Sequence, residues 1–162
     1  MNRRTTVALI ARAMLLSVVV LLWGNGKSCA QQADIDSVKA VVAAYHAAIG
    51  SLDMSKMDPL WAHDAYVMAI QPSEKSISVG WDAVKKGWET LPNFWSELKV
   101  TQADGPHIHV DGNVAWSMGI ANAVGKTKAG AAVNAPTFEA DVFEKRGSQW
   151  LLASHAAWRV PQ

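Results

Sequence analysis

Cysteine is almost absent from this chain of 162 residues, which contains only Cys29. That residue lies in an N-terminal segment, residues 1–30, that we predict to be removed from the mature protein. The mature chain would then hold no thiol, no disulfide and no cysteine ligand for a metal. Its stability would come from its hydrophobic core, since a domain of about 130 residues buries roughly two thirds of its unfolded surface.

Basic clusters are missing as well. The chain has 15 Lys and Arg residues against 14 Asp and Glu residues, and four of the basic ones lie in the first thirty positions: Arg3, Arg4, Arg12 and Lys27. Without them, 15 − 4 = 11 basic residues would face 14 acidic ones, a net charge of −3. A mildly acidic surface without a basic run argues against nucleic acid as a partner.

No uninterrupted apolar run is long enough for a membrane span. The apolar core of the N-terminal segment, residues 13–23, has eleven residues, whereas a spanning helix needs about 20. Ser28-Cys29-Ala30 gives the small-residue pattern of a cleavage site before Gln31. We therefore predict a secretory signal over residues 1–30, export to the periplasm or the medium, and no stable membrane association. A twin-arginine start and lipidation at Cys29 are alternatives that the flanking residues fit less well.

The remainder, residues 31–162, has no internal repeat or low-complexity segment, and we predict one domain there. Residues 33–49 should form a helix, because their apolar residues recur at three- and four-residue spacing until a glycine follows. A short second helix should follow Asp53, which is a good N-cap. A third should begin at Trp81 and end or kink at Pro92.

Most of the expected strands follow the helices, over residues 99–103, 107–110, 114–124, 137–144 and 150–160. One more strand is expected between the second and third helices, over residues 64–70. Asp111-Gly112 is a strong hairpin signal between two of them. This order predicts an α+β domain with its helices on one side of a bent sheet.

His155 is the most informative single residue, because it interrupts an apolar strand whose two faces both look buried. A titratable ring in such a place needs a hydrogen-bond partner or a ligand. Glu139 or Asp141, on the preceding strand, could form a proton-transfer pair with it across the hairpin. A structural hydrogen bond inside the core is the alternative.

The order of these elements and four local stretches resemble the nuclear transport factor 2-like (NTF2-like) superfamily, and within it the SnoaL-like branch. The stretches are residues 41–45 leading to Asp53, 60–65, 80–84 and 150–155. The resemblance implies a cone-shaped domain, in which three N-terminal helices pack on a strongly curved, mainly antiparallel sheet and leave a pocket at the wide end. Family members commonly dimerise through the outer face of the sheet, so we expect a homodimer.

The superfamily includes ketosteroid isomerases, polyketide cyclases, dehydratases and members without catalysis. Tyr45 falls where the isomerases carry a tyrosine that donates to an oxyanion, and their second acid would fall near Glu139 or Asp141. Their aspartate base would fall near Ala69, which cannot take a proton. We therefore name Tyr45, Glu139 and His155 as candidate catalytic residues. Because Ala69 cannot act as the base, we do not expect the reaction of the steroid isomerases.

The expected partner is a small apolar or aromatic ligand. Candidate contacts to it are the large or polar side chains Trp61, Trp88, Trp116, His109 and Arg159. Arg159 shares a strand face with His155 and could meet an anionic group at the mouth of the pocket. His107 and His109 have a spacing able to chelate a metal, but no close third ligand supports them, and we predict neither a metal nor a cofactor.

Three functions remain open at this point. The first is a ligand-binding protein with an apolar pocket, in which catalysis is possible. The second is an isomerase, cyclase or dehydratase acting on an apolar carbonyl compound through His155 and Tyr45. The third is a non-catalytic dimerisation domain. A carbonic anhydrase-like branch of the superfamily is a more distant option, because residues 154–157 keep only part of its C-terminal motif.

Overall fold

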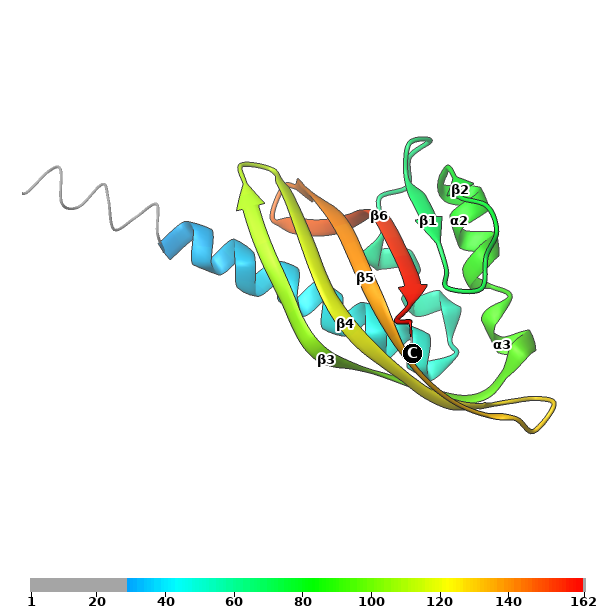
Figure 1. Ribbon diagram of the computed structural model, residues 1–162. Coiled ribbons are helices and arrows are strands. Elements are labelled where there is room, and N and C mark those ends of the chain that lie inside the picture. Colours follow the sequence, from blue (N-terminus) through cyan, green and yellow to red (C-terminus); the bar gives the residue numbers. More distant parts are fainter. Residues whose placement is uncertain (1–28, 162) are drawn as a thin grey trace, which may run out of the picture. The chain divides into compact units, whose positions relative to one another are not determined.

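The computed structural model describes residues 29–161 (Figure 1). Most of the predicted signal segment therefore lies outside the described residues. The chain forms two compact units, and the described part of the first, residues 29–34, is helical. All the other elements belong to the second unit, Ile35–Gln162. Within residues 29–161, no helix is both long and apolar enough to cross a membrane.

Helical residues run from 29 to 51, so the helix predicted over residues 33–49 is confirmed with wider bounds. Its buried residues recur three or four positions apart, as expected for a helix that covers a core with one stripe. They are Val38, Val42, Tyr45, His46, Ala48 and Ile49. The apolar members of this stripe share one core with residues of the sheet such as Ala115, Phe143 and Leu152.

The helix predicted after Asp53 is instead two short 3-10 helices, η1 (Met54–Lys56) and η2 (Asp58–Leu60). The Asp53 side chain accepts a hydrogen bond from the backbone N–H of Ser55, so its capping role is confirmed. Pro59 lies in the first turn of η2 and has no N–H to donate, which favours two separate turns over one continuous helix.

The third predicted helix is confirmed as α2 (Trp81–Trp88), followed by a separate short helix, α3 (Leu91–Phe94). Pro92 lies in the first turn of α3, where its missing N–H costs nothing. The break before α3 redirects the chain into the first long strand of the sheet.

The sheet has six strands in the order β2-β1-β6-β5-β4-β3 (Figure 1). Their bounds are β1 (Met68–Ile70), β2 (Ser78–Val79), β3 (Trp95–Asp111), β4 (Val114–Thr127), β5 (Ala132–Arg146) and β6 (Gln149–Arg159). The pair β1–β6 is parallel and the other neighbours are antiparallel. The three helices pack against this curved, mixed sheet, which confirms the predicted α+β fold.

Three strand predictions need correction. The strands predicted over residues 99–103 and 107–110 are one strand, β3, which bulges near Pro106 but stays paired with β4. The strand predicted over residues 64–70 is only Met68–Ile70. The two-residue strand β2 was not predicted, because a strand so short carries no readable alternation.

Alternation along the strands gives the sheet two different faces. The face toward the helices carries mainly small and polar side chains, among them Ser117, Ala121, Glu139, Asp141 and His155. The opposite face carries large apolar side chains that stay 40–56% exposed: Trp116, Met118, Val142 and Trp158. We call these four residues the outer patch.

Candidate functional site

A cavity of about 550 Å³ lies between the inner face of the sheet and the helices. Its sheet wall includes four alanines, Ala121, Ala123, Ala135 and Ala157, whose methyl groups are too short to fill the space between the layers. Bulky apolar side chains, including Trp88, Leu91 and Phe94, form the opposite wall. Such a cavity, mostly apolar with a few polar groups, has the size and character of a small-molecule site.

Two of those polar groups are buried at one end of the cavity. Glu139 and His155 both line it and are 8% and 2% exposed. Their strands are neighbours, with Asp141 opposite His155 and Glu139 opposite Ala157. Glu139 and His155 are therefore diagonal neighbours on one face of the sheet.

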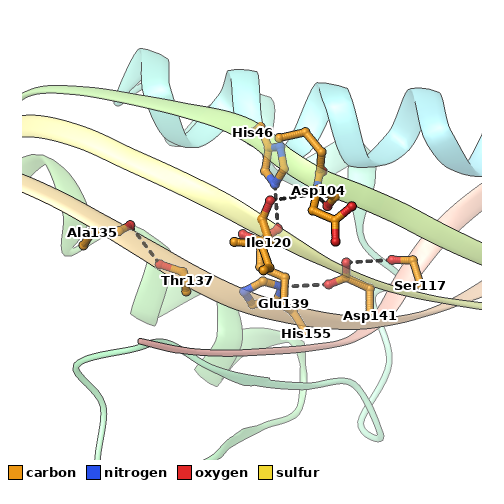
Figure 2. A network of polar contacts seen from close by, with 10 residues as sticks. His46, Asp104, Ser117, Ile120, Ala135, Thr137, Glu139, Asp141 and His155 are labelled. Carbon is orange, nitrogen blue, oxygen red and sulfur yellow. Dashed lines mark hydrogen bonds and ion pairs between the residues drawn. The ribbon is translucent and has the colours of Figure 1, made fainter. Parts of the chain in front are cut away.

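His155 belongs to a chain of three buried side chains. Its Nδ1 lies 2.7 Å from Oδ1 of Asp141, and Ser117 Oγ donates to Asp141 Oδ2 over 3.0 Å (Figure 2). An ionised carboxylate only accepts hydrogen bonds, so this contact places the His155 proton on Nδ1. The second ring nitrogen, Nε2, then carries the lone pair, and Figure 2 shows it directed away from Asp141. The sequence hypothesis of a His155–carboxylate pair is realised with Asp141.

A second buried pair joins the first helix to the sheet. Nε2 of His46 lies 2.8 Å from Oε2 of Glu139, and His46 is 6% exposed (Figure 2). By the same reasoning the imidazole donates and the carboxylate accepts. The pair fixes the Glu139 side chain at the wall of the cavity.

Tyr45 lies directly beside His155, with 4.9 Å between the ring centroids, and its ring also packs edge-on against Trp88 at 5.4 Å. Its hydroxyl is buried and makes no hydrogen bond within residues 29–161. Burial, followed by the charges of Glu139 and Asp141, holds the pKa of Tyr45 well above its usual value of 10.0. The nearby Gln71 amide opposes this pKa shift, but its Nε2 is also left without a well-formed hydrogen bond. The Tyr45 hydroxyl therefore keeps its proton and can act only as a hydrogen-bond donor or acceptor.

The structure brings most of the sequence-predicted site residues to this region. Trp88, Glu139, His155 and Arg159 line the cavity. Tyr45 lies against His155, just behind the cavity surface. These positions follow from strand alternation in β5 and β6 and from the buried stripe of the first helix.

Three predicted ligand contacts lie elsewhere. Trp61 is 1% exposed and packs against Tyr45 and Trp88 in the core. Trp116 and His109 stack on each other with 4.3 Å between ring centroids, on the outer face of the sheet. Because Ala115 and Ser117 face inward, Trp116 between them must face outward. Trp61, Trp116 and His109 therefore do not line the cavity.

No metal cluster is present in the described part of the chain, where no group of three His, Cys, Asp or Glu side chains could hold an ion. His107 is exposed and lies 3.4 Å from Asp104. Asp64, which precedes β1, is paired with Arg146.

His46 is the residue that sequence reasoning missed. The signal for it was present, because position 46 follows Val42 by four residues and precedes Ile49 by three, which places it on the buried stripe. A histidine on such a stripe needs a polar partner from another element. Glu139, already a candidate, supplies it.

Chemically, the arrangement suits proton transfer. His155 has one nitrogen fixed by a carboxylate, and its other nitrogen has no partner among residues 29–161, which is the usual form of an oriented general base. Tyr45 supplies a proton-bearing hydroxyl beside it, and Glu139 supplies a second titratable group at the wall. None of these groups requires a cofactor to move a proton.

Comparisons with known proteins identify the domain family and the fold. The family model described as a SnoaL-like domain matches residues 38–157. A Streptomyces avermitilis protein of the NTF2-like family, provisionally named a dehydratase, is 18% identical with a TM-score of 0.72, and the match covers 82% of this chain and 99% of that one. An NTF2-like superfamily protein from Salmonella enterica is 17% identical with a TM-score of 0.73, covering 84% and 94%.

A Novosphingobium aromaticivorans protein, provisionally named a scytalone dehydratase, is 13% identical with a TM-score of 0.69, and the match covers 80% of this chain and 86% of that one. At such identities the likeness shows the fold alone. Comparison with curated proteins gave no match.

Proposed function

Because the chain belongs to the SnoaL-like domain family, we propose that it binds a small, mainly apolar carbonyl compound in the cavity and that His155 exchanges a proton with it. One observation carries the proposal. His155 lies at the cavity wall with Nδ1 committed to Asp141, while Nε2 has no hydrogen-bond partner within residues 29–161. Solved structures that share this fold include proteins provisionally named dehydratases.

In the proposed first step, Nε2 of His155 removes a proton from the carbon next to the ligand's carbonyl. The electron pair of the broken C–H bond forms a C=C bond, and the carbonyl oxygen becomes an enolate oxygen. Tyr45, which keeps its proton because its pKa is raised, donates a hydrogen bond to that oxygen. The Tyr45 hydroxyl lies behind the cavity surface, so Gln71 must move aside slightly for the ligand oxygen to reach it.

The second step decides the reaction class. If a hydroxyl group lies on the β-carbon, its C–O bond breaks and His155 returns the proton to the departing oxygen, so that water leaves and an enone remains. If the ligand instead carries a C=C bond between its β- and γ-carbons, the electron pair spreads over a dienolate, His155 returns the proton to the γ-carbon, and the product is the conjugated isomer. Both outcomes use the same residues and the same oxidation state, and therefore need no electron carrier.

A panel of apolar ketones tests the first step without knowledge of the natural substrate. The panel should include 4-phenylbutan-2-one and the β-hydroxy ketone 4-hydroxy-4-phenylbutan-2-one. Proton NMR in D2O reports deuterium uptake next to the carbonyl, and ultraviolet absorption reports the enone formed when water leaves. We expect His155→Gln to slow catalysed exchange by about 100-fold, and the exposed control His107→Gln to leave it unchanged.

The result also separates the alternatives. Ligand binding without catalysed exchange would favour a binding protein that carries out no chemistry. Absence of both binding and exchange across the panel would favour a non-catalytic dimerisation domain.

We also propose that the protein is a homodimer and is exported. The outer patch supports the dimer, because four large apolar side chains on one sheet face remain exposed in the single chain. The basic start, apolar core and small-residue cleavage pattern of residues 1–30 support export.

A further inference from the structure

Arg159 is the one lysine or arginine among the described residues that line the cavity. It ends β6 on the same face as His155 and Ala157, opposite Thr137 of β5. Its side chain is exposed and has no ion pair or hydrogen bond within residues 29–161. The cavity therefore has a free cation at its open edge.

The cavity wall around His155 is acidic. Asp141 lies directly behind His155, and Glu139 lies opposite Ala157, between His155 and Arg159; both carboxyl groups are buried. Buried carboxylates repel a second negative charge strongly, because few water molecules screen them. An anionic group on a ligand would therefore be rejected at the His155 end and accepted only at the Arg159 end.

The distance between the two ends limits the ligand. Arg159 lies four residues beyond His155 on an extended strand, which separates their Cα atoms by about 13 Å. Ala157 and Glu139 lie between them, and Ala135 and Val133 continue the apolar wall beyond Arg159. Both residues line the cavity, so a ligand that contacts both His155 and Arg159 needs a segment of several carbon atoms between its two polar groups.

We propose, on the basis of the function proposed above, that the ligand is an organic anion, a ketone with a terminal carboxylate that pairs with Arg159. The planar guanidinium offers two parallel N–H donors to the two carboxylate oxygens. This pairing orients the molecule with its carbonyl at His155 and its charge in the solvent-facing mouth.

Isothermal titration calorimetry with a matched pair of probes tests this. The charged probe is 6-oxo-6-phenylhexanoate and the neutral one is its methyl ester, which has the same apolar body and the same ketone. The variants are Arg159→Gln and, as a control, Lys86→Gln, which removes one positive charge from the exposed side of α2 outside the cavity. Thermal unfolding midpoints check that both variants fold.

We expect the wild-type protein to bind the carboxylate about tenfold more tightly than the ester, as a charge-assisted hydrogen bond implies. Arg159→Gln should reduce this preference to near unity, and Lys86→Gln should keep it. Equal affinities in the wild type, or a preference that survives Arg159→Gln, would overturn the inference and leave the proposed function standing. Failure of both probes to bind any variant would instead count against the proposed function itself, and against the anionic ligand with it.

Discussion

Replacing Tyr45 with phenylalanine should raise stability and lower activity at the same time. The Tyr45 ring is 2% exposed and packs against Trp88 and His155, contacts that phenylalanine retains. The hydroxyl, in contrast, is buried without a hydrogen-bond partner in the described residues. The substitution therefore removes only the hydroxyl, which makes no hydrogen bond within the described residues.

The size of the effect follows from the cost of an unpaired buried group, about 1–3 kcal/mol. Tyr45→Phe should therefore raise the free energy of unfolding by about 1 kcal/mol or more, which shifts the melting temperature upward by roughly 3–5 °C for a domain of this size. The loss of a hydrogen bond to a developing enolate oxygen should slow proton exchange by about 100-fold. Urea unfolding followed by tryptophan fluorescence, and the ketone exchange assay, measure the two effects.

Alkaline pH gives a second test of the same residue. The folded-state pKa of Tyr45 is raised well above 10.0, while in the unfolded chain it is about 10. Below pH 10 both the folded and the unfolded state hold the proton, so the hydroxyl contributes no pH dependence to the free energy of unfolding. Above it only the unfolded state releases the proton, so the stability of the wild type falls as pH rises. The advantage of Tyr45→Phe should therefore be larger at pH 11 than at pH 8.

Two results would refute this reasoning. A variant destabilised by more than about 1 kcal/mol would show that the hydroxyl has a structural partner in the folded protein. Unchanged exchange in a well-folded Tyr45→Phe variant would show that the hydroxyl takes no part in the chemistry.

Three further predictions concern the carboxylate, the outer patch and the N-terminus. Asp141→Asn should slow proton exchange by about 100-fold and lower stability by about 1–3 kcal/mol, whereas Ser117→Ala should largely keep the exchange rate; equal effects on exchange would argue against an orienting role for Asp141. Light scattering should give a dimer for the wild type and a monomer for Trp116→Glu, and a monomeric wild type at micromolar concentration would contradict the proposed interface. Mass spectrometry of exported protein should find Gln31 as the first residue, and a lipid on Cys29 or an intact N-terminus in the membrane fraction would count against the predicted cleavage.

The helices and long strands could be predicted because each carries many repeats of its own period. The first helix has a buried stripe over several turns, and β4 and β6 are long enough for alternation to be visible. The pairing of His155 with a carboxylate could also be predicted, because a buried imidazole demands a partner and β5 offers only Glu139 and Asp141 nearby. Which of the two it uses depends on the register, which the sequence does not display.

The inward face of β4 could not be predicted by the usual rule that large apolar residues are buried. One face carries Trp116 and Met118, and the other carries Ala115, Ser117 and Ala121. The small face points inward, because the helices lie close to it at one end and the cavity occupies the space at the other. Trp116 was expected to line the cavity because of its size, but it lies on the outer face of the sheet.

The alanines of the cavity wall make the volume of the cavity easy to change by substitution. Ala123, Ala135 and Ala157 contribute little side-chain packing, while the aromatic residues Tyr45, Trp61 and Trp88 fill the interior beside them. Enlarging any of these alanines to valine or leucine would remove a portion of the void without disturbing that aromatic cluster. Single substitutions at these alanines would therefore change the size of ligand that the cavity accepts while the surrounding scaffold stays the same.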